Sequence, residues 1–350
     1  MKTPRFKLFF LSVLVLIVTL SCTVTIGQSP EAETPTLETA SPTLLSEYST
    51  QAVTPSPSEL LPAPQEVLSS ATPSQEQAPL FTTENCDEDV CILEGSFLLK
   101  RPIGSDGRNA IDTASRYGTL RRRIRDVYHG VQFLNSTGTP VYAAEAGDVE
   151  VAGDDSQNFY GPRLGMFGNL VIIKHSLPGI PEPVYTLYAH LSELSTKAEG
   201  DVGAGEQIGL VGMSGSVRGS TLYFEVRYGD NDYDAAVNPE LWLEPLRDQT
   251  GDLMGALAGK VIDGQGNYVA IRNIQIESLR TAAEGKLRPI YIRTYLDPAQ
   301  MGLSPWGESF AAGDLPEGTY LIWFWYGPNE YIREVEIQPG KLTFVTFVVK

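Results

Sequence analysis

Short runs of β-branched and aromatic residues, separated by Gly, Asn and Pro, fill the chain from about residue 86 onward. Examples are residues 139–143, 147–151, 169–174 and 184–188. Runs of four to eight such residues bounded by turn formers are typical of β-strands, and helical periodicity is weak throughout. The sequence therefore predicts an all-β fold.

The strand signals fall into two groups, which we assign to domains at 85–248 and 256–350. The second group includes residues 257–263, 274–277, 314–320 and 342–349. Several strands spaced by turn signals in fewer than a hundred residues are typical of a small β-sandwich.

Residues 23–84 have a different composition, dominated by Ser, Thr, Pro, Glu and Ala with few aromatic side chains. Such a segment buries too little apolar surface to offset the conformational entropy lost on ordering. We expect a disordered tether that its prolines keep partly extended.

Residues 1–22 have the pattern of an export signal. Lys2, Arg5 and Lys7 precede an apolar run over residues 8–20, which is too short for a permanent membrane span. The run ends in Ser21-Cys22, which resembles a bacterial lipobox, although Thr19 stands where that motif usually has an aliphatic residue. We expect an extracellular, cell-envelope protein held at the membrane by lipid on Cys22; the alternative is plain secretion.

Charge and cysteine content narrow the function. The formal net charge of −17 argues against nucleic acid as a partner and against charge-driven binding to anionic lipid. Cys86 and Cys91 form an even pair, so outside the cytoplasm we expect them to close a small disulfide loop; the alternative is two free thiols.

An ordered series of short motifs fills the middle of the chain. They are residues 128–133, 138–141, 146–149, 168–172, 185–191, 205–209, 212–215 and 222–227. Together, from about residue 123 to 243, they resemble the lysostaphin/LytM-type zinc endopeptidases, which cut peptide cross-links in bacterial cell walls. The resemblance implies a LytM-type, duplicated-hybrid-motif β domain.

The positions that hold zinc in that family are altered here. The family's His-x-Gly-x-Asp motif aligns on Gly130, which places Tyr128 and Gln132 at two ligand positions. The third ligand position, in the family's His-Leu-His motif, is Tyr223, and Thr221 replaces the histidine that assists catalysis. His190 alone keeps its family residue, which handles protons in active members.

A catalytic zinc needs three protein ligands and an open position for water. A phenol and a neutral amide do not replace imidazole and carboxylate. The other histidines, His129 and His175, match no ligand position. We therefore expect no metal and no cofactor, and His190 alone cannot hydrolyse a peptide bond at a useful rate.

The C-terminal segment resembles carboxypeptidase-regulatory-type or transthyretin-like sandwiches, on the motifs at residues 259–266, 314–320 and 339–340. Its aromatic run, residues 322–326, suggests either a strand buried on both faces or a carbohydrate-stacking surface; we favour burial on both faces.

The function that follows is a non-catalytic LytM-type protein that binds peptidoglycan or regulates a cell-wall hydrolase. Tyr128, Thr221, Tyr223 and His190 would then line the floor of a peptide groove. The alternatives are an active zinc metalloendopeptidase with atypical ligands and a structural or adhesive surface protein.

Overall fold

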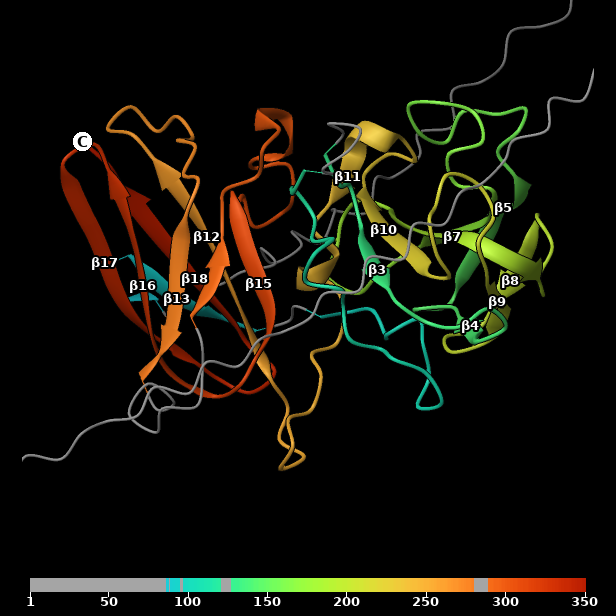
Figure 1. Cartoon of the computed structure of the whole chain (residues 1–350), viewed down its shortest axis with the longest axis horizontal. Coiled ribbons are helices and arrows are strands. Elements are labelled where there is room, and N and C mark those ends of the chain that lie inside the picture. Colours follow the sequence, from blue (N-terminus) through green and yellow to red (C-terminus); the bar gives the residue numbers. More distant parts are fainter. Residues whose placement is uncertain (1–85, 88, 95–96, 121–126, 280–288) are drawn as a thin grey trace, which may run out of the picture. The chain divides into compact units, whose positions relative to one another are not determined.

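The computed structural model describes residues 86–87, 89–94, 97–120, 127–279 and 289–350 (Figure 1). The predicted signal segment with Cys22 and the predicted tether at 23–84 lie outside the described residues. The described part contains strands, turns and three short 3-10 helices, so the predicted all-β fold is confirmed. No helix in this part of the chain is both long and apolar enough to cross a membrane.

The middle segment forms a nine-stranded antiparallel sheet. Its main path runs β11-β10-β7-β6-β5-β8, with β3 paired to β10 and β9 paired to both β4 and β7. The strands are β3 (Val131–Phe133), β4 (Pro140–Tyr142), β5 (Gly147–Asp154), β6 (Asn169–His175), β7 (Val184–Leu194), β8 (Gly200–Val202), β9 (Gln207–Val211), β10 (Leu222–Tyr228) and β11 (Ala236–Val237). The 3-10 helices η2 (Tyr233–Ala235) and η3 (Pro239–Leu241) follow β10.

The C-terminal segment contributes two further sheets, and the predicted sandwich is confirmed. One sheet has the order β1-β2-β18-β12-β15, and the other has the order β14-β13-β16-β17. Their strands are β1 (Cys86–Asp87), β2 (Val90–Leu93), β12 (Gly255–Ile262), β13 (Ile274–Ser278), β14 (Ile290–Ile292), β15 (Phe310–Leu315), β16 (Gly318–Tyr326), β17 (Asn329–Ile337) and β18 (Leu342–Val348), with η4 (Pro298–Gln300) before β15.

Strands β12 and β18 pair in parallel and are buried on both faces. Leu257 and Val345 pack in the core between the two C-terminal sheets. Ala258 and Phe344 point the other way and belong to the core of the middle segment. This explains the nearly unbroken apolar run of β12, because a strand covered on both sides needs no polar face.

The N-terminal hairpin belongs to the C-terminal sheet. Cys86 and Cys91 are joined by a disulfide across β1 and β2. β2 then pairs with β18, so that Cys91 lies opposite Phe344. The sequence grouped residues 85–248 in one domain because it carries no signal for this long-range pairing; the hydrogen bonds attach residues 86–93 to the sandwich instead.

The aromatic run in β16 is buried on one face only, which corrects the expectation of burial on both. Ile322 and Phe324 lie in the core, whereas Trp325 is 57% exposed and Trp323 is half-buried. The cause is the sheet's position, because β14-β13-β16-β17 packs on the other C-terminal sheet with one face and leaves its second face uncovered.

Polar contacts join the middle segment to the sandwich. Asp314, at the end of β15, accepts hydrogen bonds from Arg101 at 2.5 Å and from the backbone N–H of Leu246 at 2.8 Å. Nearby, Glu240 pairs with Arg116 at 2.5 Å and accepts the N–H of Gly313 at 2.8 Å. Asp314 thus accepts two donors from the middle segment, and Glu240 accepts one donor from each side of the junction.

We expect Asp314→Asn to lower the free energy of unfolding by about 1–3 kcal/mol, because it removes the charge that faces the largely buried Arg101 guanidinium. Asn tolerates the left-handed backbone conformation of this residue (φ 55°), so strain is not added. Urea unfolding measures the change. Glu317→Gln, at an exposed neighbour, is the control, and an equal effect of both substitutions would contradict the assignment.

Candidate functional site

Two of the altered ligand positions are cross-strand neighbours. Tyr223 on β10 lies opposite Gln132 on β3 and opposite Ala189 on β7. Residues directly opposite one another in antiparallel strands share a face of the sheet. The structure therefore places Gln132 and Tyr223 side by side. His190 is the next residue along β7 after Ala189, so it is also close to Tyr223.

Tyr223 starts a buried hydrogen-bonded chain along its own strand. Its phenol donates to Glu225 Oε2 at 2.7 Å, and Arg227 Nε donates to Glu225 Oε1 at 2.6 Å. The Arg227 guanidinium also reaches the carbonyl oxygen of Tyr160 at 2.6 Å and Asn231 Oδ1 at 2.9 Å. Alternate residues of a strand point to one face, so Tyr223, Glu225 and Arg227 are neighbours on one face of β10. Their side chains are hydrogen-bonded to one another.

Burial fixes the chemical state of the Tyr223 phenol. Desolvation, followed by the negative charge of Glu225, raises its pKa well above the ordinary value. The phenol therefore stays protonated and acts as a hydrogen-bond donor. The ion pair between Glu225 and Arg227 is fully buried, so removing either charge would leave the other unpaired at high cost.

An aromatic and aliphatic cluster fills the same face of the sheet. Tyr223 packs with Met166 and Phe167 from the loop between β5 and β6, and its ring centroid is 5.5 Å from that of Phe167. Asp155 holds this loop in place by accepting the N–H groups of Phe167 at 2.7 Å and Gly168 at 2.9 Å. Part of this loop therefore covers the candidate site.

His190 lies beside this cluster. Its ring centroid is 6.1 Å from that of Tyr223, and its Nδ1 donates to the carbonyl oxygen of Ser214 at 2.9 Å. The residue has a left-handed backbone conformation (φ 65°), which is costly for a residue with a Cβ. Its N–H donates to the Phe167 carbonyl oxygen at 2.9 Å, which helps to hold that conformation.

Little of the candidate site is accessible. Tyr223, His190 and Thr221 are 4%, 3% and 2% exposed, and Gln132 is 8% exposed. Tyr128 is half-buried against the cluster. The Thr221 hydroxyl donates a hydrogen bond to the Phe133 carbonyl oxygen at 3.0 Å, so it contacts the backbone of β3 rather than the Tyr223 cluster. The side chains expected on a groove floor are thus mostly interior, and Tyr128 offers the most surface.

The remaining histidines are structural. His129 Nδ1 donates to the Tyr233 carbonyl oxygen at 2.9 Å, and the two rings stack with centroids 3.9 Å apart. His175 is fully buried; its Nδ1 donates to the Ala146 carbonyl oxygen at 2.9 Å and its Nε2 accepts from Thr186.

The residues at the candidate site do not fit the zinc of the resembled family. Tyr223 is protonated and bound to Glu225, and the Gln132 amide carries no charge. Zinc sites use thiolate, imidazole and carboxylate donors. Over the described ranges, no group of three or more His, Cys, Asp or Glu side chains is arranged to hold a metal ion.

The sequence motifs predicted where the candidate site lies, but they did not predict which other side chains pack and bond there. Glu225 and Arg227 carry a usable signal, because they continue the period-2 pattern from Tyr223 on an otherwise apolar strand. The covering role of Met166 and Phe167 has no local signal, since it depends on how the loop folds back.

The profile described as peptidase family M23 matches residues 126–239. Lipoprotein NlpD of Yersinia enterocolitica is 34% identical over 110 residues, which cover 31% of this chain and 93% of that protein. Cell division protein DipM of Caulobacter vibrioides is 36% identical over 116 residues, which cover 33% of this chain but only 17% of that protein.

Among solved structures, the catalytic domain of the antimicrobial peptidase lysostaphin from Staphylococcus simulans is 26% identical. The match covers 35% of this chain and 85% of that domain, with a TM-score of 0.31.

We expect Tyr223→Phe to lower the free energy of unfolding by about 1–3 kcal/mol, because it leaves one buried oxygen of Glu225 without a donor. Denaturant titration measures the loss. Tyr185→Phe is the matched control, since Tyr185 lies in the same cluster. Equal losses in the two variants would show that the phenol of Tyr223 is not engaged.

We expect His175 to make stability depend on pH. Burial lowers its pKa below 6.5, so the folded protein binds this proton less readily than the unfolded chain does. Its contribution to stability is complete above about pH 6.5 and is lost as the pH falls toward the folded-state pKa. Unfolding between pH 7.5 and 5 should show a shallower decline for His175→Gln; parallel declines would contradict this.

Proposed function

The chain belongs to peptidase family M23, and we propose that it is a non-catalytic member that binds cell-wall peptidoglycan. The observation that carries the proposal is the state of Tyr223, which occupies a family ligand position as a protonated phenol bonded to Glu225. Without the ion there is neither a Lewis acid nor a metal-bound hydroxide to attack a peptide bond.

Loss of the metal centre is compatible with retention of the scaffold. The core of the nine-stranded sheet is built from apolar side chains such as Phe133, Tyr188 and Phe224, none of which belongs to the altered site. Aromatic packing around Tyr223 supplies cohesion where the family has a metal. The fold can therefore present a wall-binding surface without cutting.

We further propose a cell-envelope location, with lipid on Cys22 as the anchor. Support comes from the export-type sequence of residues 1–22 and from the relative named a lipoprotein. The DipM relative is named a cell division protein, and a partner hydrolase is the alternative ligand to the wall itself.

A second candidate function is that of a spacer or adhesive protein on the cell surface. The burial of His190, Tyr223 and Thr221 favours it, because these side chains leave little of the former catalytic face for a ligand.

The test combines zinc analysis, a cleavage assay and wall binding on the purified full-length protein. We expect well under one zinc per chain, no release of cross-link peptides, and co-sedimentation with purified peptidoglycan. An active M23 endopeptidase serves as the positive control for cleavage.

Stoichiometric zinc together with chelator-sensitive cleavage would overturn the proposal in favour of an atypical enzyme. Absence of zinc, cleavage and wall retention would favour the spacer, and retention only after crosslinking to a hydrolase would favour the regulatory alternative.

A further inference from the structure

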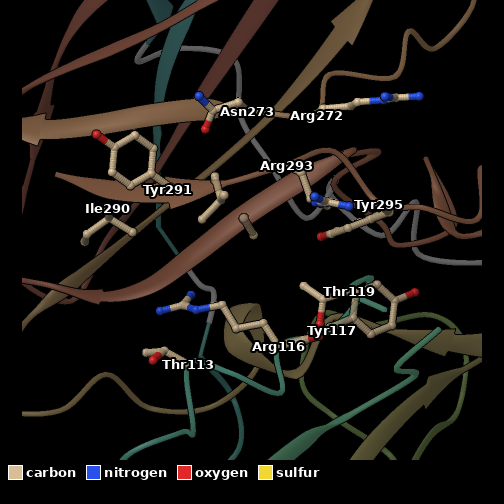
Figure 2. Close-up of a pocket in the computed structure, with 12 residues that line it drawn as sticks. Thr113, Arg116, Tyr117, Thr119, Arg272, Asn273, Ile290, Tyr291, Arg293 and Tyr295 are labelled. Carbon is tan, nitrogen blue, oxygen red and sulfur yellow. Dashed lines mark hydrogen bonds between the residues drawn. The ribbon is translucent and has the colours of Figure 1, made fainter. Parts of the chain in front are cut away.

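A pocket of about 540 Å³ lies at the junction between the middle segment and the sandwich. Figure 2 shows Thr113 and Arg116 on one side of it and Arg272 and Asn273 on the other, with Arg293 between them. The lining residues come from the segment before β3, the segment before β13, β14 with the residues just after it, and β15.

The pocket has a cationic lining in a strongly acidic chain. Arg116, Arg272 and Arg293 all line it, and no Asp or Glu does, although the formal net charge of the chain is −17. Arg116 donates from one nitrogen to Glu240 at 2.5 Å, and its other N–H groups are not used in that bond. Within the described residues, the Arg272 and Arg293 side chains form no hydrogen bond or ion pair.

The floor of the pocket is rigid. The rings of Tyr117 and Tyr295 meet edge to face with centroids 4.9 Å apart. Tyr117 donates to the Ala236 carbonyl oxygen at 2.7 Å, and the Tyr295 hydroxyl contacts both Asn238 and Glu308 at 3.0 Å. Groups held in this way lose little freedom when a ligand binds, which favours affinity.

The side chains that line the pocket indicate which class of ligand it can bind. Guanidinium groups bind carboxylates and phosphates through paired hydrogen bonds. Ile290, Ile292 and Ala311 add apolar surface, and Thr113 and Thr119 add hydroxyls. A bare inorganic anion would leave most of this volume and all of its apolar wall unused, so an oxyanion attached to an organic body fits better.

A second hollow shares two lining residues with the first. Arg272 and Asn273 also line a cavity of about 330 Å³ that includes Trp323 and Trp325. Trp325 is 57% exposed on the uncovered face of β16. A ligand that is longer than one anionic group can therefore extend from the arginines to an aromatic surface suited to stacking on a sugar ring.

We propose that this junction pocket binds the carboxylate-bearing peptide of a cell-wall glycopeptide, with Arg272 and Arg293 as the main anionic contacts and Arg116 as an auxiliary one. The proposal rests on the wall-binding function proposed above and names its site. It places recognition away from the filled face around Tyr223, at a surface formed jointly by both parts of the described chain.

The test uses the full-length protein and a soluble disaccharide-peptide released from purified wall, labelled on its sugar. We expect Arg272→Gln with Arg293→Gln to weaken binding about tenfold or more, as expected for loss of charge-assisted hydrogen bonds. Amidating the carboxylates of the fragment should weaken binding to the wild type to a similar extent. Arg108→Gln, at an exposed arginine outside the pocket, should leave affinity unchanged.

Neither Arg272 nor Arg293 has a side-chain partner to lose within the described chain. The free energy of unfolding of the double variant should therefore lie within about 0.5 kcal/mol of the wild-type value. Unchanged affinity in the double variant would overturn the proposal. The proposal would also be overturned if inorganic phosphate, or an unrelated acidic peptide, bound the protein as tightly as the wall fragment does.

The two proposals fail in different ways. If the double variant still co-sediments with intact wall and binds the soluble fragment normally, wall binding stands and the pocket assignment falls. If the wild type binds neither intact wall nor fragment, the proposed function itself falls.

Discussion

The hydrogen bond between the Tyr223 phenol and Glu225 sets the arrangement of the side chains on one face of β10. It ties Tyr223 to a carboxylate that is itself paired with Arg227, so three alternate side chains of β10 are bound to one another. The opposite side chains of the same strand, such as Phe224, build the core. One face of β10 thus packs in the core, and the other face holds the hydrogen-bonded side chains of the candidate site. The two sets are separate because successive side chains of a strand point to opposite faces.

The second organising feature is the sheet that contains β12 and β18. One of its faces completes the sandwich and the other completes the core of the nine-stranded sheet. Carboxylates at its edge, on Asp314 and on the facing Glu240, satisfy donors from both sides. The junction is therefore a packed interior that polar contacts cross, and it supplies the walls that a pocket between two β units needs.

Much of this could be predicted from the sequence, and the limits are physical. The all-β class followed from short strands and turn residues, and the family followed from motifs that keep their order along the chain. The one-sided burial of Trp325 could not be read locally, because it depends on which sheet face is covered. The pairing of β2 with β18 likewise joins distant residues, and loop residues such as Phe167 reach the site only through tertiary folding. The Tyr223–Glu225–Arg227 alternation was visible, but its burial was not.

The attachment of the N-terminal hairpin has a mechanical consequence. The disulfide between Cys86 and Cys91 shortens the path of any tension that enters from upstream, and passes it directly to β2. β2 is held by its ladder with β18, so the load reaches the sandwich before it reaches any strand of the nine-stranded sheet. With the anchor proposed above at Cys22, traction on the N-terminal side would thus be borne first by the backbone hydrogen bonds between β2 and β18.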